Sequence, residues 1–418
     1  MTPSPQSQTT VLDLAFVRAH FPALTGEWVF MDNAGGSQIL RPVVDRINEQ
    51  LLTSHVQHGA SYAVSQLSMQ RVREATEAMA TLVNAREPEE IVMGGATTLL
   101  IRLLSLSFAQ TLQIGDEVIV SNSDHEANVS PWMDLQKQGI VVNIWKIRPD
   151  TLRFELEDLA ALMTDRTRLV ALTHTSNVLG TLNPIKDIAR MVHARGALIC
   201  VDGTAHAPHR LIDVQDLDAD FYIFSTYKVY GPHYALLYGK KELLLRLPGL
   251  NHYFIREDEL PYKFQPGNVN FELAYGMLGL ADYLSAVARH HSETSPDSLR
   301  DQMALAFDLF SRHEERLAGR LLTFLQTKPG IRIIGESSPS RALRVPTICF
   351  VQGDRPSDDI VSRVDPHQVA IRYGDFYAKK LIHDLGLAAQ NGVVRVSMVH
   401  YNTLEEVDRL IAALEEVL

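Results

Sequence analysis

The sequence predicts an α/β protein that is built on a layered sheet and is followed by a smaller α+β region. Apolar strands alternate with amphipathic helices over about 250 residues, which is the pattern of a sheet covered by helices. Several strands are unbroken aliphatic runs, such as 117–121 and 198–201, as expected where both faces of a sheet are buried. Near residue 280 the pattern changes to long helices and a separate set of strands.

The predicted elements fall into two groups along the chain. The larger region is expected to hold strands at 90–93, 117–121, 141–145, 169–173, 198–201, 221–224 and 235–238, with helices at 43–53, 68–83 and 185–194. The smaller region is expected to hold helices at 281–291, 299–327 and 403–418, a polar turn at 292–297, and strands at 331–334, 347–351, 369–371 and 393–397. In α/β sheets the chemistry lies at the carboxyl ends of the strands, so those positions decide the functional analysis.

Composition excludes several classes of protein. The chain has 39 basic and 50 acidic residues, a formal net charge of −11, which argues against nucleic acid or an anionic membrane surface as a partner. Two cysteines are too few for a disulfide framework or a zinc cluster, and no metal site is expected. The start of the chain lacks the pattern of a signal peptide, and the apolar stretch 99–108 is short and interrupted by Arg102. We therefore expect a cytoplasmic enzyme with no membrane segment.

Two charged residues follow neighbouring strands of the predicted sheet. Asp202 comes directly after the strand 198–201, and Lys228 lies in the segment STYK that follows 221–224. A carboxylate at the end of a buried strand is costly unless a positive group meets it. A purely structural ion pair explains these two residues as well as a catalytic pair does.

Three further strand ends carry polar groups. The segment GGATT at 94–98 leads into a helix and can form an anion cradle, although a threonine there is also an ordinary helix cap. His125 follows one strand, and the polar loop 173–180 follows another. Together these positions supply an anion site, an aromatic ring, an amide donor, a carboxylate and a lysine. That set matches the requirements of pyridoxal phosphate.

At this point the sequence resembles a known family, the class V aminotransferases, within the fold-type I group of pyridoxal-phosphate enzymes, and especially the cysteine desulfurases. The resemblance rests on segments that occur in order over nearly the whole chain: MDNAGGSQ (31–38), GGAT (94–97), DHEANVSPW (124–132), HTSNVLGTLNP (174–184), VDGTAHAPH (201–209), DFYIFSTYKVYGP (220–232), PGNVN (266–270), IRYGDFYA (371–378) and RVSMVHYNTLEE (395–406). It implies a large cofactor domain at 27–280 with a mostly parallel seven-stranded sheet. A small domain at 281–418 and an N-terminal segment at 1–26 that packs on it complete the expected fold.

The resemblance also implies roles for individual residues. Lys228 is expected to carry the cofactor as a Schiff base and later to move the Cα proton, while Asp202 keeps the pyridine nitrogen protonated. His125 is expected to stack on the ring and to act as an acid or base, and Arg395 to bind the substrate carboxylate. The expected cofactor-binding residues are Ala96, Thr97, His125, Asn177, Asp202, Ser225, Tyr227, Lys228 and Asn268. The expected substrate-binding residues are Asn33, Ala34, Arg372, Tyr377 and Arg395.

Some positions depart from the family pattern. Ala205 stands where the family usually has a glutamine, and His206 beside it is a candidate replacement. Tyr227 stands in place of a histidine, and Asn268 in place of a threonine that reaches the phosphate from a neighbouring subunit. If Asn268 keeps that position, the active site is completed across the interface of a homodimer.

The departure that bears most on the reaction concerns sulfur. Tyr377 occupies the loop position at which a desulfurase carries its nucleophilic cysteine. Cys200 and Cys349 both lie in apolar strands and are expected to be buried and inert. An enzyme acting at Cα and Cβ of an amino acid remains, and a C–S lyase acting on cysteine, cystine or an S-substituted cysteine needs the fewest groups. Racemisation with His125, Tyr62 or Tyr377 as second base, transamination, and a non-catalytic cofactor-binding scaffold remain alternatives.

Overall fold

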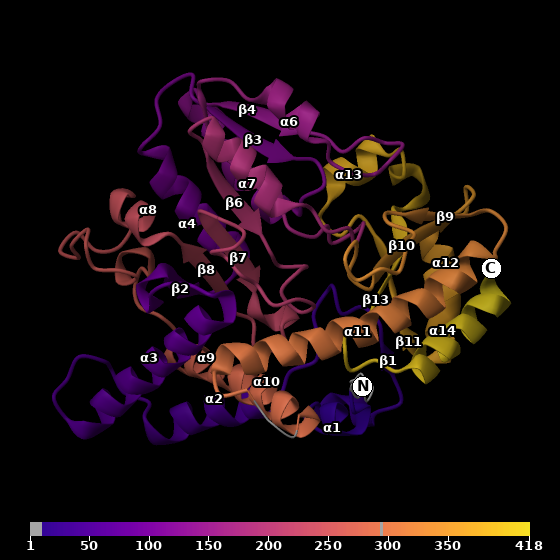
Figure 1. Ribbon diagram of the computed structural model, residues 1–418, viewed down its shortest axis with the longest axis horizontal. Helices are drawn as coiled ribbons and strands as arrows, with labels where there is room; N and C mark the ends of the chain where they lie inside the picture. Colours follow the sequence, from indigo (N-terminus) through magenta and orange to yellow (C-terminus); the bar gives the residue numbers. More distant parts are fainter. Residues whose placement is uncertain (1–10, 293–295) are drawn as a thin grey trace, which may run out of the picture.

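The computed structural model of the protein describes residues 11–292 and 296–418. A seven-stranded sheet forms its centre (Figure 1). Its strand order is β2-β8-β7-β6-β5-β3-β4. The strands are β2 (Ile91–Gly94), β3 (Glu117–Ser121), β4 (Val141–Trp145), β5 (Thr167–Thr173), β6 (Leu198–Asp202), β7 (Phe221–Ser225) and β8 (Ala235–Gly239). Only β8 runs antiparallel to its neighbours among these strands. The predicted α/β class with a mostly parallel sheet is confirmed.

Both faces of this sheet are covered, which explains the unbroken aliphatic runs. In β3, Val118 and Val120 enter one buried cluster and Ile119 enters another on the opposite face. The helices of this part are α2 (Arg41–Thr53), α3 (Ala63–Val83), α4 (Thr97–Ala109), α5 (Ser130–Met133), α6 (Leu156–Leu162), α7 (Ile185–Ala194), α8 (Lys241–Arg246), α9 (Phe271–Gly276) and α10 (Leu278–His291). Helix α4 packs on the face of Val118, and α7 packs on the face of Ile119. Across the described residues, none of the helices combines the length and apolar character required to cross a bilayer.

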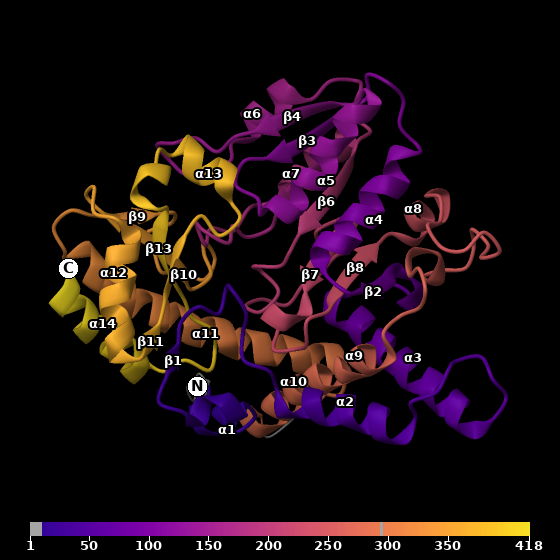
Figure 2. The same cartoon turned by 180° about the vertical axis from the view of Figure 1, so that it is seen from behind.

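A second, four-stranded sheet with the order β12-β13-β10-β9 forms the smaller region (Figure 2). Its strands are β9 (Ile331–Ile334), β10 (Thr347–Gln352), β12 (Arg372–Gly374) and β13 (Val393–Ser397), all paired antiparallel. Its helices are α11 (Leu299–Gln326), α12 (Ser357–Val364), α13 (Lys379–Asp384) and α14 (Leu404–Val417). A two-stranded pair, β1 (Val29–Phe30) with β11 (Val369–Ala370), links the start of the chain to this region.

The N-terminal helix α1 (Leu14–Arg18) contacts both regions. Arg18 forms an ion pair with Glu406 of α14 (2.8 Å), and the ring of Phe16 stacks on His290 at the end of α10 (3.9 Å between centroids). The first ten residues of the expected segment 1–26, and residues 293–295 of the expected turn 292–297, lie outside the described residues. The domain boundaries at 26 and 280 stay predictions.

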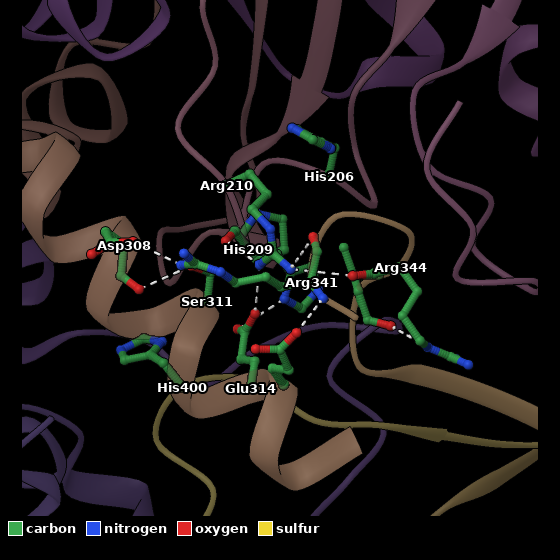
Figure 3. Close-up of polar contacts among 12 residues, drawn as sticks. His206, His209, Arg210, Asp308, Ser311, Glu314, Arg341, Arg344 and His400 are labelled. Carbon is green, nitrogen blue, oxygen red and sulfur yellow. Dashed lines mark hydrogen bonds and ion pairs between the residues drawn. The ribbon is translucent and has the colours of Figure 1, made fainter. Parts of the chain in front are cut away.

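A buried polar joint connects the two regions (Figure 3). Glu314 of α11 accepts hydrogen bonds from Arg210 (3.0 Å) and pairs with His209 (2.9 Å), both of which follow β6. Arg210 also donates to the backbone carbonyls of Arg341 and Arg344 (3.2 Å each). The next residue after Arg344 contacts the loop that follows β5, because the Val345 N–H donates to the Gly180 carbonyl (2.9 Å). The joint therefore fixes the loop after β5 against the smaller sheet.

We expect Gly180→Ala to lower the free energy of unfolding much more than Gly196→Ala. Both glycines have positive φ (67° and 74°), where a Cβ costs about 1 kcal/mol or more. At Gly180 a Cβ would also overlap the backbone carbonyl of Thr347, whereas at Gly196 nothing lies within 4 Å. Overpacking against backbone adds roughly 1–3 kcal/mol. Urea denaturation of the two variants measures the difference, and equal losses would show that the joint is not tightly packed at Gly180.

Candidate active site

The predicted cofactor-binding residues meet at the carboxyl ends of the central strands. Asp202 is the last residue of β6 and pairs in register with Thr173 of β5, while Ser225 ends β7 and Lys228 follows one turn later. One cavity is lined by Ala96, Thr97, Thr98, His125, Ala127, Thr173, Thr175, Asn177, Asp202, Thr204, Ala205, Ser225, Tyr227 and Lys228. The structure thus brings together all of the predicted cofactor-binding residues except Asn268.

The amine of Lys228 is buried and forms no hydrogen bond or ion pair with any residue that the structure describes. Burial lowers the pKa of Lys228 to about 8, and the positive charge of Arg395 acts in the same direction. The carboxylates of Asp202 and Asp32 oppose this shift in pKa without cancelling it. A desolvated lysine of lowered pKa is partly neutral near physiological pH and is a nucleophile for carbonyl groups.

Two buried acidic side chains, Asp124 and Asp202, lie near each other at this edge of the sheet. The Oδ1 of Asp202 accepts a hydrogen bond from the Thr204 N–H (2.8 Å). Asp124 accepts from the side chains of Asn128 (2.7 Å) and Ser121 and from the Thr173 N–H (3.0 Å). Burial raises the pKa of Asp124 to about 8, and the nearby charge of Asp202 adds to that shift. The raised pKa favours the protonated form of Asp124, which reduces the negative charge beside Asp202.

An anion site lies at the first turn of α4. The hydroxyl of Thr97, its first residue, is 2.6 Å from the hydroxyl of Ser225, and Ala96 occupies the N-cap position. The backbone N–H groups of a helix N-terminus and two hydroxyls suit a phosphate group. Burial raises the pKa of the Tyr227 phenol beside them, so this side chain stays a neutral donor.

His125 follows β3 and Asn177 follows β5, and both side chains line the cavity. The Nδ1 of His125 accepts from the Ala127 N–H (3.0 Å), so a neutral ring carries its proton on Nε2. Burial and the charge of Lys228 lower the pKa of His125 below its ordinary value, which favours that neutral form. The side-chain amide of Asn177 donates to the carbonyl of Phe376 (2.8 Å) and keeps a second N–H for another acceptor.

A second cavity adjoins the first and contains the expected carboxylate clamp. It is lined by Ala34, Gly35, His125, Asn177, Tyr227, Lys228, Arg372, Tyr373, Gly374, Asp375, Phe376, Tyr377 and Arg395. Arg395 donates to Asp32 (2.8 Å) and to the Asn177 carbonyl (3.3 Å), and its guanidinium stacks 3.7 Å from the ring centroid of Phe376. Arg372 lies 3.5 Å from the other oxygen of Asp32. One carboxylate between two guanidiniums leaves a positive charge for a substrate carboxylate.

Asp32 is a functional residue that the sequence reasoning missed. It lies in the segment MDNAGGSQ, which was one of the segments that carried the resemblance, but only its neighbours Asn33 and Ala34 were expected to bind substrate. The Asn33 side chain is buried, donates to the carbonyls of Phe30 (3.0 Å) and Ser397 (2.9 Å), and lines neither cavity. Asn33 therefore connects β1 to β13 through its side-chain amide.

Two other residues expected at the cofactor site, Asn268 and His206, do not line the cavity. Asn268 is exposed, accepts from the Val269 N–H (3.1 Å) and does not line the cavity. Ala205 lines the cavity, but His206 does not; its ring stacks on His174 (3.6 Å between centroids) and its Nδ1 bonds the Thr175 hydroxyl (3.1 Å). Burial lowers the pKa of both histidines well below the ordinary value, to about 3 for His174, so both are neutral.

Both cysteines are fully buried, as the sequence indicated. Cys200 lies inside β6 and Cys349 inside β10, and neither lines either of the two cavities described above. Burial raises the pKa of Cys349 to about 12 and that of Cys200 still further, so neither forms a thiolate. Tyr377 lines the second cavity, with 69% of its surface exposed.

Comparison with known proteins identifies the family. The family model described as aminotransferase class-V matches residues 29–306 and 299–410. The chain belongs to the class V aminotransferase family. An aminotransferase-like protein from Gibberella zeae is 42% identical over 410 residues, covering 96% of this chain and 98% of the relative. A cysteine desulfurase-like protein from Aspergillus flavus is 34% identical, covering 97% and 91%. The crystal structure of a cysteine desulfurase from Escherichia coli is 28% identical with a TM-score of 0.83, covering 97% and 98%.

Class V aminotransferases use pyridoxal 5′-phosphate, and this chain is a pyridoxal-phosphate-dependent enzyme of that family. The residues present fit the group independently of the comparisons. The unpaired buried amine of Lys228 suits its aldehyde, the Asp202 carboxylate its ring nitrogen, and the hydroxyls of Thr97 and Ser225 its phosphate. The fold, the enzyme class and the cofactor expected from the sequence are therefore confirmed, while the individual residue roles stay predictions.

The burial of Lys228 predicts a stability cost in the cofactor-free protein. A lysine whose pKa falls from 10.5 to about 8 on folding destabilises the folded state by roughly 3 kcal/mol below pH 8. The unfolded chain binds the extra proton between those values, so this cost shrinks as the pH rises from 8 toward 10.5. We expect Lys228→Met to raise the free energy of unfolding of the cofactor-free protein at pH 7.

Denaturation curves of the wild type and of Lys228→Met at pH 7 and at pH 9.5 measure this difference. The stabilisation should be smaller at the higher pH. A variant that is less stable than the wild type at pH 7 would contradict the view that the Lys228 amine is buried without a partner.

Proposed function

We propose that the protein is a pyridoxal-phosphate-dependent C–S lyase that catalyses β-elimination from cysteine, cystine or an S-substituted cysteine. The observation that carries this proposal is the combination of a complete lysine–carboxylate–arginine set with the loss of an accessible thiol. Lys228, Asp202 and Arg395 meet in adjoining cavities, whereas Cys200 and Cys349 are buried away from them. Without a thiolate to accept sulfur, a released sulfur must leave as a free thiol.

The residues of the chain suffice for this elimination. The bound cofactor supplies an electron sink that acidifies the Cα proton of the substrate. Arg395 holds the substrate carboxylate, and Lys228 takes the Cα proton. The Nε2–H of the neutral His125 ring can donate a hydrogen bond to the departing sulfur, which leaves as a thiolate. The released aminoacrylate takes up water to give pyruvate and ammonia, while the sulfur leaves as hydrogen sulfide from cysteine, a thiol from an S-substituted cysteine or a persulfide from cystine. No second base is needed on the opposite face.

We also propose that the active enzyme is a cytoplasmic homodimer that acts on a small amino-acid substrate. Large apolar side chains stand exposed on α2 and on the loop after α8, namely Leu52 (84%), Tyr253 (99%) and Phe254 (65%). The rings of Tyr253 and Phe254 lie beside each other (5.6 Å between centroids), and adjacent exposed apolar side chains are typical of protein interfaces. Asn268 is exposed as well, which leaves its amide free to reach the phosphate site of a neighbouring subunit.

Product analysis across cysteine, cystine, a cysteine S-conjugate and alanine tests the reaction. We expect pyruvate and ammonia from the cysteine derivatives, and no turnover from Lys228→Ala, which lacks the base. Alanine with sulfide would indicate desulfuration, and exchange of the Cα proton with deuterium alone would indicate racemisation with His125 or Tyr377 as second base. A new amino acid formed from an added keto acid would indicate transamination, and no reaction at all would favour a binding protein. Turnover by Lys228→Ala would contradict the assigned base.

The two cysteines should be dispensable. We expect the double variant Cys200→Ala/Cys349→Ala to keep its turnover per folded molecule, because both thiols are buried and lie outside the cavities. Pyruvate formation is compared with the wild type after circular dichroism and cofactor absorbance have shown that fold and loading are retained. Loss of turnover in a folded, loaded double variant would restore a persulfide mechanism.

A further inference from the structure

A large outer cavity adjoins the substrate cavity on the side away from Lys228. Its volume is about 1020 Å³, against about 350 Å³ for the substrate cavity. It lies between the ends of β3 and β4 and helix α13, which are neighbours in both views of the molecule (Figures 1 and 2). The two cavities share Tyr373, Gly374, Asp375 and Tyr377 as lining residues. The two cavities therefore adjoin at Tyr377, beside the place where a molecule reacting at Lys228 would lie.

Tyr377 stands at the junction of the two cavities, on a backbone that is held in place. The Glu126 N–H donates to the Tyr377 carbonyl (2.8 Å), and the Tyr377 N–H donates to Asp375 (3.0 Å). Phe376 and Tyr377 both have positive φ (52° and 59°), a costly conformation for bulky residues that is found mainly at functional sites. The Tyr377 ring lies 5.2 Å from that of His125 and is largely exposed to the cavities.

The charges that line the outer cavity are unequally neutralised. Asp384 is paired with Lys146 (3.2 Å) and accepts from Asn122 (3.0 Å). The other two carboxylates accept only from neutral donors, Glu126 from the Ser130 hydroxyl (2.6 Å) and Asp375 from the Tyr377 N–H, and therefore keep their negative charges.

The side-chain ammonium groups of Lys379 and Lys380, by contrast, form no ion pair or hydrogen bond with any described residue. The rest of the lining includes the apolar side chains of Ile144 and Ile382. The cavity therefore presents two free ammonium groups beside an apolar wall.

We infer that the outer cavity binds the distal end of the substrate, and that this end is a carboxylate on an apolar spacer. This inference rests on the proposed lyase function and specifies its substrate class: a cysteine whose sulfur carries a carboxyalkyl group. Arg395 holds the α-carboxylate, the Cβ–S bond lies beside Lys228, and the sulfur substituent passes Tyr377 to Lys379 and Lys380.

Substrate pairs that differ only in the distal charge test the inference. S-(2-carboxyethyl)-L-cysteine and S-(3-carboxypropyl)-L-cysteine are compared with their side-chain amides, with pyruvate release as the readout. We expect kcat/KM of the holoenzyme to be about fivefold to tenfold higher for each acid than for its amide, the size of one to two partly exposed ion pairs. In Lys379→Gln/Lys380→Gln the ratio of acid to amide should fall to about one.

A matched control separates local from long-range charge effects. Lys137→Gln/Lys186→Gln makes the same change in net charge at two lysines that pair with Asp134 and Asp216 outside the outer cavity. It should keep the wild-type ratio. An acid-to-amide ratio near one in the wild type, or an equal fall in both double variants, would overturn the inference.

A binding measurement keeps the inference testable if no substrate is cleaved. L-2-Aminoadipate, L-2-aminopimelate and their side-chain amides have no leaving group at Cβ, and their binding to the holoenzyme is measured by calorimetry. We expect the diacids to bind more tightly than the amides, with the preference lost in Lys379→Gln/Lys380→Gln. This preference without pyruvate from any cysteine derivative would leave the distal site standing and remove the lyase function. Pyruvate from cysteine without any acid preference would do the reverse.

Discussion

The burial of one unpaired amine is the constraint on which the rest of the site depends. Lys228 follows β7 by a single turn, and the parallel pairing of β6 with β7 sets Asp202 at the same edge of the sheet. Neither carboxylate that opposes its desolvation makes a direct ion pair with it, so the amine keeps a lowered pKa and a free lone pair. Such an arrangement costs stability and is retained where a lysine must react. The hydroxyls at the start of α4 and the neutral ring of His125 are placed around that amine.

The substrate cavity exists only because two regions of the chain meet. Lys228, His125 and Asn177 come from the large sheet, whereas Arg395 comes from β13 of the small sheet. Asp32, just after β1, bridges to β13 and holds the Arg395 guanidinium. The buried pairing of Glu314 with Arg210 and His209 fixes these regions relative to each other. A carboxylate clamp and a base supplied by separate regions must be aligned within a fraction of an ångström, which gives the polar joint its importance.

The sequence alone predicted the central sheet and its catalytic edge because their signals are local. Aliphatic runs of about five residues can be read directly, and Asp202 and Lys228 adjoin two of them. Strand β11 overlaps the predicted strand 369–371, but its partner β1 was not predicted, since two residues are too short a run to show a period. Asp32 was missed for a related reason: its contact with Arg395 spans 363 residues, and no pattern near Asp32 indicates that partner. The raised pKa of Asp124 likewise depends on burial that only the folded chain provides.

The loop that carries Tyr377 shows how one framework supports different outcomes. Its backbone is anchored by Asn177 and Glu126 and adopts a left-handed conformation at two bulky residues. A cysteine held in that position would line the same cavity as Lys228 and Arg395. A tyrosine in the same position has no sulfur chemistry to offer, but its ring forms part of the wall between the reacting centre and the outer cavity. This loop position therefore offers no thiol to accept sulfur at the place where the two cavities adjoin. Both consequences follow from one residue, because a single loop position faces both cavities.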